Sequence, residues 1–520
     1  MVRVRTASAF VIAVATVLAW SAAPATQQFG SITFPTSGAP AAQEAFLTGV
    51  KALHNFQFDE AAVAFQEAQK ADPAFAMAYW GEAMSHNHPL WAQQDIPKAK
   101  AALDKLAPTH EARLAKAKLP KEKALLEAMH TLYFSPGDKL ARDLAYSSQM
   151  ARLYEQYPDD HEIGTFYALS LLGSVRPGDT GFRRQALAAS IAEKIFAANP
   201  QHPGAAHFVI HAFDDPDHAP LALQAANAYA KIAPSAAHAL HMPSHIYVQR
   251  GMWQQVVLSN IDAYKAAVDL NAKLKLPEGR EDFHTLGWLA YGNLMLGKAD
   301  EAKKNVEAAK AAADRNPKAA NIRDGYLGMR ARYIQETGQW EKLALPAPVA
   351  ASPAGGDHAG MPGMAMPGNA MGVSEGAASW IYIVGVSAAK LGDMATAEAA
   401  EAQLKGIRER AQGGANAYAA RPHAIREKEL GAIIRWAKGQ KAEALELAKG
   451  ATEVEVTMAA PSGPPDPIKP SFELYAELLA ENGQHKEAAA AFEQALLRTP
   501  NRTPSVKGLA QVQAKLKTSM

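Results

Sequence analysis

The chain has 520 residues, of which 48% are hydrophobic and 20% charged, a composition that excludes wholesale disorder. Its 53 Lys and Arg residues balance 52 Asp and Glu residues, and this formal net charge of +1 argues against a nucleic-acid-binding function. The absence of cysteine excludes disulfides, thiolate metal sites, iron–sulfur clusters and cysteine nucleophiles, and leaves 17 His and 16 Met as candidate metal ligands.

Residues 1–25 have the pattern of a secretory signal peptide. Two arginines open the segment, a short apolar run follows, and the small residues at positions 23–25 suit a cleavage site before Thr26. The apolar run is too short to cross a bilayer, and no later stretch is apolar for the roughly 18 residues that a membrane span requires. The sequence therefore predicts a periplasmic or secreted protein without a membrane span.

Residues 45–73 carry the first strong sign of an internal repeat. Small residues at Gly49, Ala61 and Ala68, an aromatic residue at Phe65 and a proline at Pro73 keep the spacing of a tetratricopeptide (TPR) helix pair. The small residues let two helices touch, the phenylalanine fills the space beside them, and the proline ends the second helix. This segment therefore resembles a TPR unit.

The same pattern returns along the chain. Residues 471–500 repeat it in full, and turns that separate two helices recur at Gly251, Gly297, Gly338, Gly392 and Gly439. The chain thus resembles TPR proteins over nearly all of its mature length. The resemblance implies an all-α, TPR-like helix-turn-helix solenoid of about eight to ten helix pairs with a long concave surface.

Two segments interrupt the expected array. Residues 345–376 are rich in Met, Pro and Gly and are expected to be a loop, and residues 456–470 are expected to be a proline-rich linker. They divide the mature chain into a first TPR array over 26–344, further TPR-like helices over 377–455, and a C-terminal unit with a capping helix over 471–520.

Histidines gather in a pattern tied to the repeat. His207 and His211 are four residues apart, and His241 and His245 occupy the same two places 34 residues later. Residues at i and i+4 share one face of a helix. The resemblance to TPR proteins implies that these positions face the concave groove, so we expect the two pairs to form one patch.

His238 and His284 are expected to join this patch from equivalent places in their helices. Neighbouring helices lie about 10 Å apart, so paired imidazoles can bring three or four nitrogens to about 2.0 Å from one ion. Asp214 and Asp215 follow His211 and could orient the imidazoles, as could Glu162 from the preceding helix. The sequence predicts a transition-metal site here.

Pro243 lies between His241 and His245. It is expected either to kink the helix, which would re-aim one imidazole, or to begin a shortened helix. Two interpretations without a metal also stay open. The groove could bind an acidic peptide or a carboxylate ligand, or the histidines could serve packing alone.

Residues 238–253, HALHMPSHIYVQRGMW, add a second resemblance. They are similar to a subset of exported bacterial TPR proteins that carry a His-Met-Pro-Ser-His-Ile box. Residues 76–91, AMAYWGEAMSHNHPLW, are similar to an upstream segment of the same proteins. This likeness implies a fold and an exported setting, and it implies no reaction.

Two further groups of candidate ligands lie outside this region. His86 and His88 form a His-x-His pair near an expected turn, flanked by two tryptophans that we interpret as packing anchors. Residues 357–371, DHAGMPGMAMPGNAM, resemble the Met-rich segments of periplasmic copper-resistance proteins. Thioethers are soft ligands that suit Cu(I). The candidate ligands in this second group are His358, Met361, Met364, Met366 and Met371.

No P-loop, GxSxG, HExxH or dinucleotide-binding pattern is present in the sequence, so the interpretation leans away from an enzyme. The favoured function is the handling or delivery of a transition metal, copper before other divalent ions. The first alternative is a periplasmic interaction scaffold that binds a peptide or an envelope protein in its groove. The second is a copper-dependent oxidase that uses the same histidines.

Overall fold

The computed structural model describes residues 28–176, 178–179, 181–348, 373–413 and 417–518. The expected signal segment, residues 1–25, lies outside this part of the chain, and so does the methionine-rich segment with its five candidate ligands. Among the described residues, no helix is long and apolar enough to cross a membrane.

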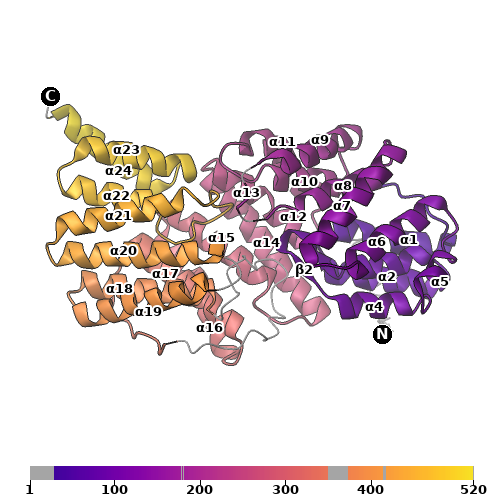
Figure 1. Cartoon of the computed structure of the whole chain (residues 1–520), viewed down its shortest axis with the longest axis horizontal. Helices are drawn as coiled ribbons and strands as arrows, with labels where there is room; N and C mark the ends of the chain where they lie inside the picture. The colour runs from indigo at the N-terminus through magenta and orange to yellow at the C-terminus, as the bar shows by residue number, and fades with distance from the viewer. Residues whose placement is uncertain (1–27, 177, 180, 349–372, 414–416, 519–520) are drawn as a thin grey trace, which may run out of the picture.

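The described chain is a succession of helices, each packed against the next (Figure 1). The helices up to the middle of the chain are α1 (Pro40–His54), α2 (Phe58–Ala71), α3 (Ala76–Met84), α4 (Ile96–Asp104), α5 (His110–Leu114), α6 (Pro120–Phe134), α7 (Lys139–Gln156), α8 (His161–Leu172), α9 (Arg183–Ala198), α10 (Pro203–Ala212), α11 (Ala219–Ile232), α12 (Ala237–His241) and α13 (Pro243–Gln249). Two short strands, β1 (Asn87–His88) and β2 (Gln93–Gln94), pair antiparallel around the 3₁₀ turn η1 (Pro89–Trp91).

The second half continues in the same way. Its helices are α14 (Trp253–Leu274), α15 (Glu281–Met295), α16 (Ala299–Arg315), α17 (Ala320–Thr337), α18 (Glu375–Lys390), α19 (Met394–Gln412), α20 (Arg421–Ala437), α21 (Lys441–Glu455), α22 (Ser471–Glu481), α23 (His485–Arg498) and α24 (Thr503–Thr518), with the 3₁₀ turn η3 (Ala417–Ala420) before α20. The all-α TPR-like solenoid is confirmed, and the small β1–β2 hairpin is an addition that the sequence did not predict.

The turns between paired helices are where the repeat pattern placed them. All five turn glycines, Gly251, Gly297, Gly338, Gly392 and Gly439, have positive φ angles between 63° and 83°. Glycine enters this left-handed region without the steric cost that a Cβ imposes, so it ends a helix readily. At four of the five positions the next helix starts two residues later, but residues 339–348 after Gly338 contain no helix, contrary to the expectation for that turn.

Small residues at the helix contacts let the helices approach closely. Gly81 on α3 faces the fully buried ring of Phe65 on α2, and a Cβ at Gly81 would lie 2.2 Å from that ring. We therefore expect Gly81→Ala to lower the free energy of unfolding by about 1–3 kcal/mol through overpacking. Urea denaturation followed by circular dichroism measures this loss.

Gly181→Ala is the matched control for that variant, because no atom lies within 4 Å of a Cβ at Gly181. An unfolding midpoint for Gly81→Ala equal to that of the control would show that the α2–α3 contact is looser than described.

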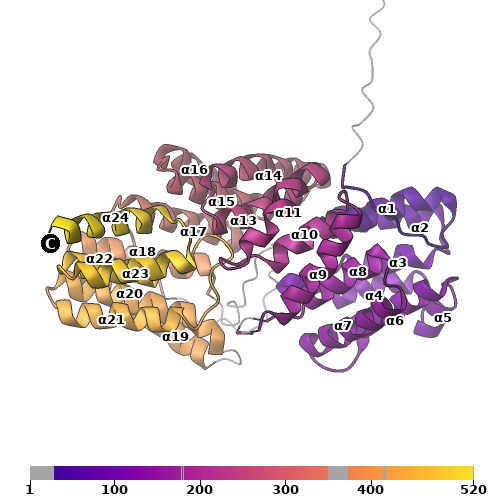
Figure 2. The same ribbon diagram turned by 90° about the horizontal axis from the view of Figure 1, so that it is seen from above.

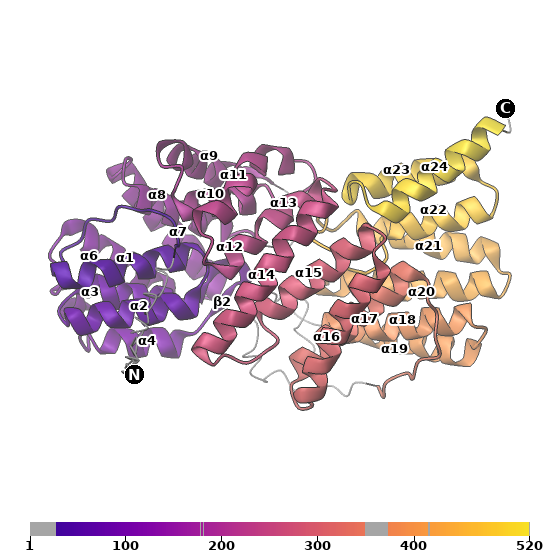
Figure 3. The same cartoon turned by 180° about the vertical axis from the view of Figure 1, so that it is seen from behind.

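The molecule is elongated, with its N-terminal helices at one end and its C-terminal helices at the other (Figures 1 and 2). Helices α10 to α15 occupy the middle, as the view from behind also shows (Figure 3). The C-terminal region reaches back to this middle part. Trp253 donates its indole N–H to the carbonyl oxygen of Asn501 at 3.1 Å, and Thr503 donates its hydroxyl to the carbonyl oxygen of Met295 at 2.6 Å.

The proline-rich segment 456–470 contains no helix and connects α21 to α22. It also lies against the middle of the molecule, because Gln249 donates its side-chain amide to the carbonyl oxygen of Pro461 at 2.8 Å. Gly463 packs so closely on Trp288 of α15 that a Cβ there would lie 2.5 Å from the indole. The segment is therefore part of the packed structure as well as a linker.

Candidate metal centre

The six histidines singled out in the sequence come together from four helices in the middle of the molecule. His207 and His211 lie on α10, His238 and His241 on α12, His245 on α13 and His284 on α15. The backbone passes from α12 to α13 through Met242, which has helical φ and ψ angles of −53° and −35°. Pro243 is the first residue of α13, so it begins a shortened helix, one of the two outcomes expected for it.

The histidines divide into two groups of three. His207, His211 and His238 form triad one, and His241, His245 and His284 form triad two, with the potential ligand atoms of each triad all within 4.8 Å of one another. Each triad therefore consists of one i,i+4 pair and one histidine from a following helix. The sequence predicted two pairs facing each other across one ion, and the structure instead divides the candidate ligands into two groups, each made of one pair and one histidine from a following helix.

The ring nitrogens within each triad face one another at short range. In triad one the Nε2 atoms of His207 and His238 are 3.2 Å apart. In triad two Nε2 of His241 lies 3.1 Å from Nε2 of His245 and 2.7 Å from Nε2 of His284. Two ligands of a tetrahedral ion with metal–nitrogen bonds of 2.0–2.1 Å are about 3.3 Å apart. The 3.1 and 3.2 Å separations are close to this value, whereas the 2.7 Å between His241 and His284 is the length of an N–H···N hydrogen bond.

The outer nitrogens determine which ring nitrogens carry hydrogen. His207 donates its Nδ1–H to the carbonyl oxygen of His54 at 2.7 Å, because a carbonyl oxygen can only accept. His241 donates Nδ1–H to Oδ1 of Asn260 at 2.7 Å. The amide of Asn260 is oriented by its own donation to the carbonyl oxygen of Val256 at 2.8 Å. In both neutral rings Nε2 is therefore left as an inward lone pair.

In each triad a carboxylate accepts the Nδ1 hydrogen of one further histidine. His245 donates Nδ1–H to Asp214 at 2.6 Å, and His238 donates Nδ1–H to Glu281 at 3.3 Å. Burial alone would raise the pKa of Glu281, but the hydrogen bond from His238 opposes it, and that pKa is lowered. An outer acceptor that holds the Nδ1 hydrogen and leaves Nε2 for the ion is the usual arrangement around metal-binding histidines.

An aromatic ring covers each triad. The ring of Phe56 lies 4.4 Å, 5.6 Å and 5.3 Å, centroid to centroid, from the three imidazoles of triad one. Trp288 lies 4.9 Å, 4.5 Å and 5.7 Å from those of triad two. Phe56 has a φ angle of 55°, an unfavourable conformation for a residue with a bulky side chain. Such backbone strain concentrates at functional sites.

The cluster is buried, where the TPR resemblance implied an open groove. The side chains of His207 and His241 are fully buried, and His211 and His245 are half-buried. Burial, followed by repulsion from neighbouring histidines, lowers the pKa of His207, His211, His241 and His284 well below the ordinary 6.5. These imidazoles are neutral near pH 7, as metal ligands must be.

We expect the metal-free protein to lose stability in mild acid. In the unfolded chain these four imidazoles bind protons near pH 6.5, whereas in the folded protein they resist protonation. The unfolded state therefore binds more protons below pH 6.5, and stability falls as the pH drops. The loss approaches about 1.4 kcal/mol per pH unit for each such group. Urea denaturation of metal-free protein at pH 7.5 and 5.5 measures it, and equal stability at both values would contradict the described burial.

A third cluster, His54, Glu162 and His202, lies behind triad one and is fully buried. His202 accepts the backbone N–H of Ala205 at Nδ1, so its Nε2 carries hydrogen and faces Glu162 at 3.2 Å. His54 donates Nε2–H to the other carboxylate oxygen at 2.6 Å. Burial raises the pKa of Glu162, but the two histidines outweigh it and lower that pKa to about 2.

This third cluster therefore differs from the two triads in its chemistry. The N–H groups of His54 and His202 point toward Glu162, so neither ring directs a lone pair at that carboxylate, and the remaining lone pair of His54, on Nδ1, is buried without a hydrogen-bond partner. The cluster instead holds together α1, α8 and the start of α10, and it fixes the carbonyl oxygen of His54 to which His207 donates. Glu162, expected to orient the cluster histidines directly, acts through His54.

The other predicted residues have separate surroundings. Asp214 contacts His245 as expected, but Asp215 instead accepts from His218, at 2.9 Å.

His88 packs on Phe58 with 4.0 Å between ring centroids, and neither it nor His86 belongs to a group of potential ligands among the described residues. Trp80 is buried in the core, which agrees with its interpretation as a packing anchor. His358 and the four methionines of its segment lie outside the described residues.

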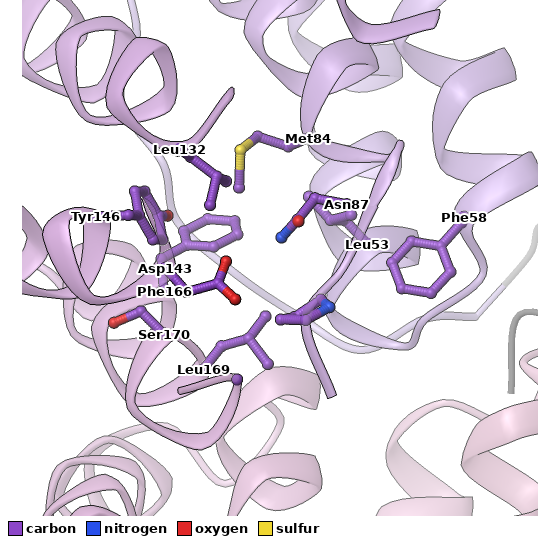
Figure 4. A pocket seen from close by; sticks show the side chains of 12 residues that line it. Leu53, Phe58, Met84, Asn87, Leu132, Asp143, Tyr146, Phe166, Leu169 and Ser170 are labelled. Atoms are coloured by element: carbon purple, nitrogen blue, oxygen red, sulfur yellow. The ribbon is translucent and has the colours of Figure 1, made fainter. Parts of the chain in front are cut away.

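A pocket lies near this region, lined by α1, α6, α7 and α8 residues such as Leu53, Leu132 and Phe166 (Figure 4). The carboxylate of Asp143 also lines it and is paired with Lys139 and Arg176, each at 2.7 Å. No histidine lines this pocket, so it is separate from the two triads.

Comparison with known proteins gives only distant similarities to solved structures. No family model and no curated protein matches the chain. The P58(IPK) TPR domain is 13% identical, with a TM-score of 0.23 over 92% of this chain and 99% of its own. Cut9 in the Cut9–Hcn1 assembly is 12% identical, with a TM-score of 0.34 over 92% and 78%. Human IFIT1, solved with m7Gppp-AAAA, is 11% identical, with a TM-score of 0.32 over 93% and 91%.

Proposed function

We propose that this chain is an exported protein that binds two transition-metal ions, one in each histidine triad, for metal handling or delivery. The observation that carries the proposal is the pair of facing Nε2 atoms in each triad. In triad one, His207 and His238 both place their hydrogens on the outer Nδ1. In triad two, His241 and His245 do the same.

Without an ion, this arrangement is unfavourable. With all four rings neutral, lone pairs face each other at 3.2 Å in triad one and 3.1 Å in triad two, with no proton between them. Burial lowers the pKa of His207 and His241, so these rings resist the protonation that would relieve the repulsion. A bound cation converts the same contacts into coordinate bonds.

The donor set narrows the choice of ion. Imidazole suits zinc, copper, iron and nickel, whereas calcium and magnesium prefer oxygen ligands. We favour copper because the sequence also holds the methionine-rich segment at residues 357–371, whose thioethers suit Cu(I). Export rests on the signal-like pattern of residues 1–25, and N-terminal sequencing of the mature protein tests it.

Elemental analysis tests the proposed metal binding. The mature chain, residues 26–520 without a polyhistidine tag, is loaded with Cu(II) or Zn(II), dialysed and analysed. We expect two ions per chain in the wild type and none in a variant with His207, His211, His241 and His245 changed to alanine. A metal-free wild type, or equal metal in both proteins, would overturn the proposal.

A second candidate function is that of an interaction scaffold, and an exposed apolar stripe on α14 favours it. Leu258, Ile261 and Val268 are 54%, 48% and 42% exposed, and their spacing places them on one helix face. A partner bound there should remain bound after chelation of metal and should be lost from Ile261→Glu. If Ile261→Glu still binds the partner, this face of α14 is excluded as the binding surface.

A further inference from the structure

We propose that the two triads are halves of one dinuclear centre, in which two metal ions share a bridging hydroxide. This inference rests on the proposed metal binding and adds that the two ions interact directly. It also assigns a ligand class to the space between them, a small oxygen anion.

The two triads are adjacent and share a helix. The five-residue helix α12 supplies His238 to triad one and His241 to triad two, three residues apart in the sequence. The ring centroids of this pair are 6.4 Å apart. A second pair across the boundary, His211 and His245, is separated by 6.2 Å. The imidazoles therefore form one continuous cluster.

The outer hydrogen bonds also cross between the triads. Asp214 follows α10, the helix of His207 and His211, but it accepts from His245 of triad two. Glu281 lies on α15, the helix of His284, but it accepts from His238 of triad one. Each triad is thus held by a carboxylate from the helix of the other. Two independent metal sites would not require carboxylates that accept hydrogen bonds from the neighbouring triad.

Each ion would lack a ligand without a bridge. A triad supplies three nitrogens, and these metals take four or more ligands. Two divalent ions carry four positive charges, against one negative charge each from Asp214 and Glu281, so a negative ligand between the ions reduces their repulsion. Binding to a cation lowers the pKa of water to about 7, so a bound water yields hydroxide and releases its proton to solvent.

Nε2 of His211 gives a second, independent indication of a ligand in this space. This atom is buried and has no hydrogen-bond partner among the described residues. Its ring lies 4.6 Å from His207 of its own triad and 6.2 Å from His245 of the other. A buried polar atom without a partner is costly in a folded protein, and coordination to an ion satisfies it.

Electron paramagnetic resonance of the copper-loaded full mature chain tests the bridge. Apo protein is loaded with Cu(II) sulfate, dialysed and treated with ferricyanide so that all copper is Cu(II). Two Cu(II) ions that share a single-atom bridge pair their unpaired spins and lose their signal. We expect two coppers per chain by elemental analysis, most of them silent, and a full Cu(II) signal after acid releases them.

A variant with one broken triad serves as the comparison. His211→Ala removes no hydrogen bond described at its Nε2, and it should bind one copper that gives a full signal. If circular dichroism shows that this variant does not fold, His284→Ala breaks the other triad and should give the same result. His218→Ala, which changes a nearby histidine outside both triads, should keep two silent coppers.

The outcomes separate this inference from the proposed function. Two bound coppers with a full signal in the wild type would overturn the dinuclear centre and leave two independent metal sites. Absence of bound copper and zinc would overturn both. A silent copper pair in His211→Ala would also overturn the assignment of the two triads as the two halves.

Discussion

Changing His241 to alanine should reduce the metal affinity of triad two by at least about 100-fold. His241 is the central ligand of this triad, with its Nε2 at 3.1 Å and 2.7 Å from those of the other two histidines. Structural zinc sites with four ligands gain about 10–16 kcal/mol, so one ligand accounts for about 3 kcal/mol, or a factor of at least about 100. Competition titration with a chromophoric chelator measures the change.

His110→Ala is the control for that experiment. His110 pairs with Glu127 near the surface and stacks on His130, away from both triads. It should bind the same two ions as the wild type with unchanged affinity. An equal loss in both variants would mean that the chain binds metal through scattered histidines.

Replacing Arg502 by methionine should lower the free energy of unfolding by about 3–5 kcal/mol. The guanidinium of Arg502 is 1% exposed and contacts Glu473 at 2.8 Å and Glu336 at 2.8 Å. Removing Arg502 leaves the buried carboxylate of Glu336 without its ion-pair partner, and this causes the loss, whereas Glu473 keeps Lys469 at 2.9 Å. Because Arg502 connects the start of α24 to α17 and α22, the effect should appear in the cooperative unfolding of the C-terminal half.

Urea denaturation followed by circular dichroism measures this effect. Adding Glu336→Gln to Arg502→Met removes the unpaired carboxylate and should recover part of the lost stability. A loss below about 1 kcal/mol for Arg502→Met alone would contradict the described burial of the network.

The repeat fold could be predicted from the sequence because its signals are local. The packing of Gly49 on Phe65 and the turn at Gly251 each depend on residues within one helix pair. The same periodicity located the six histidines, since the 34-residue shift from His207 to His241 repeats the place in the unit as well as the residue type.

The division of the cluster into two triads was not predicted, although the sequence contained a sign of it. His238 and His284 had been given equivalent places in their helices, so the repeat itself implies that one triad follows the other along the chain. The sequence also held a sign that Glu281 contacts the cluster. Glu281 lies three residues before His284 and therefore shares its helix face.

Other parts of the site depend on contacts between distant segments, which periodicity does not encode. Phe56 meets triad one from the loop after α1, and Asn260 meets His241 from α14. The pairing of His54 and His202 with Glu162 joins residues up to 148 positions apart along the chain. Asp215 was wrongly assigned because the turn after α10 directs Asp214 to the cluster and Asp215 to His218.

Anomalous diffraction tests the central claim most directly. A crystal of the mature protein is soaked in Cu(II) or Zn(II), and data are collected on both sides of the absorption edge of that metal. We predict two anomalous peaks per chain, one bounded by the ring nitrogens of His207, His211 and His238 and the other by those of His241, His245 and His284. Strong binding in solution with both triads empty, or a peak at His54, Glu162 and His202 instead, would contradict the account.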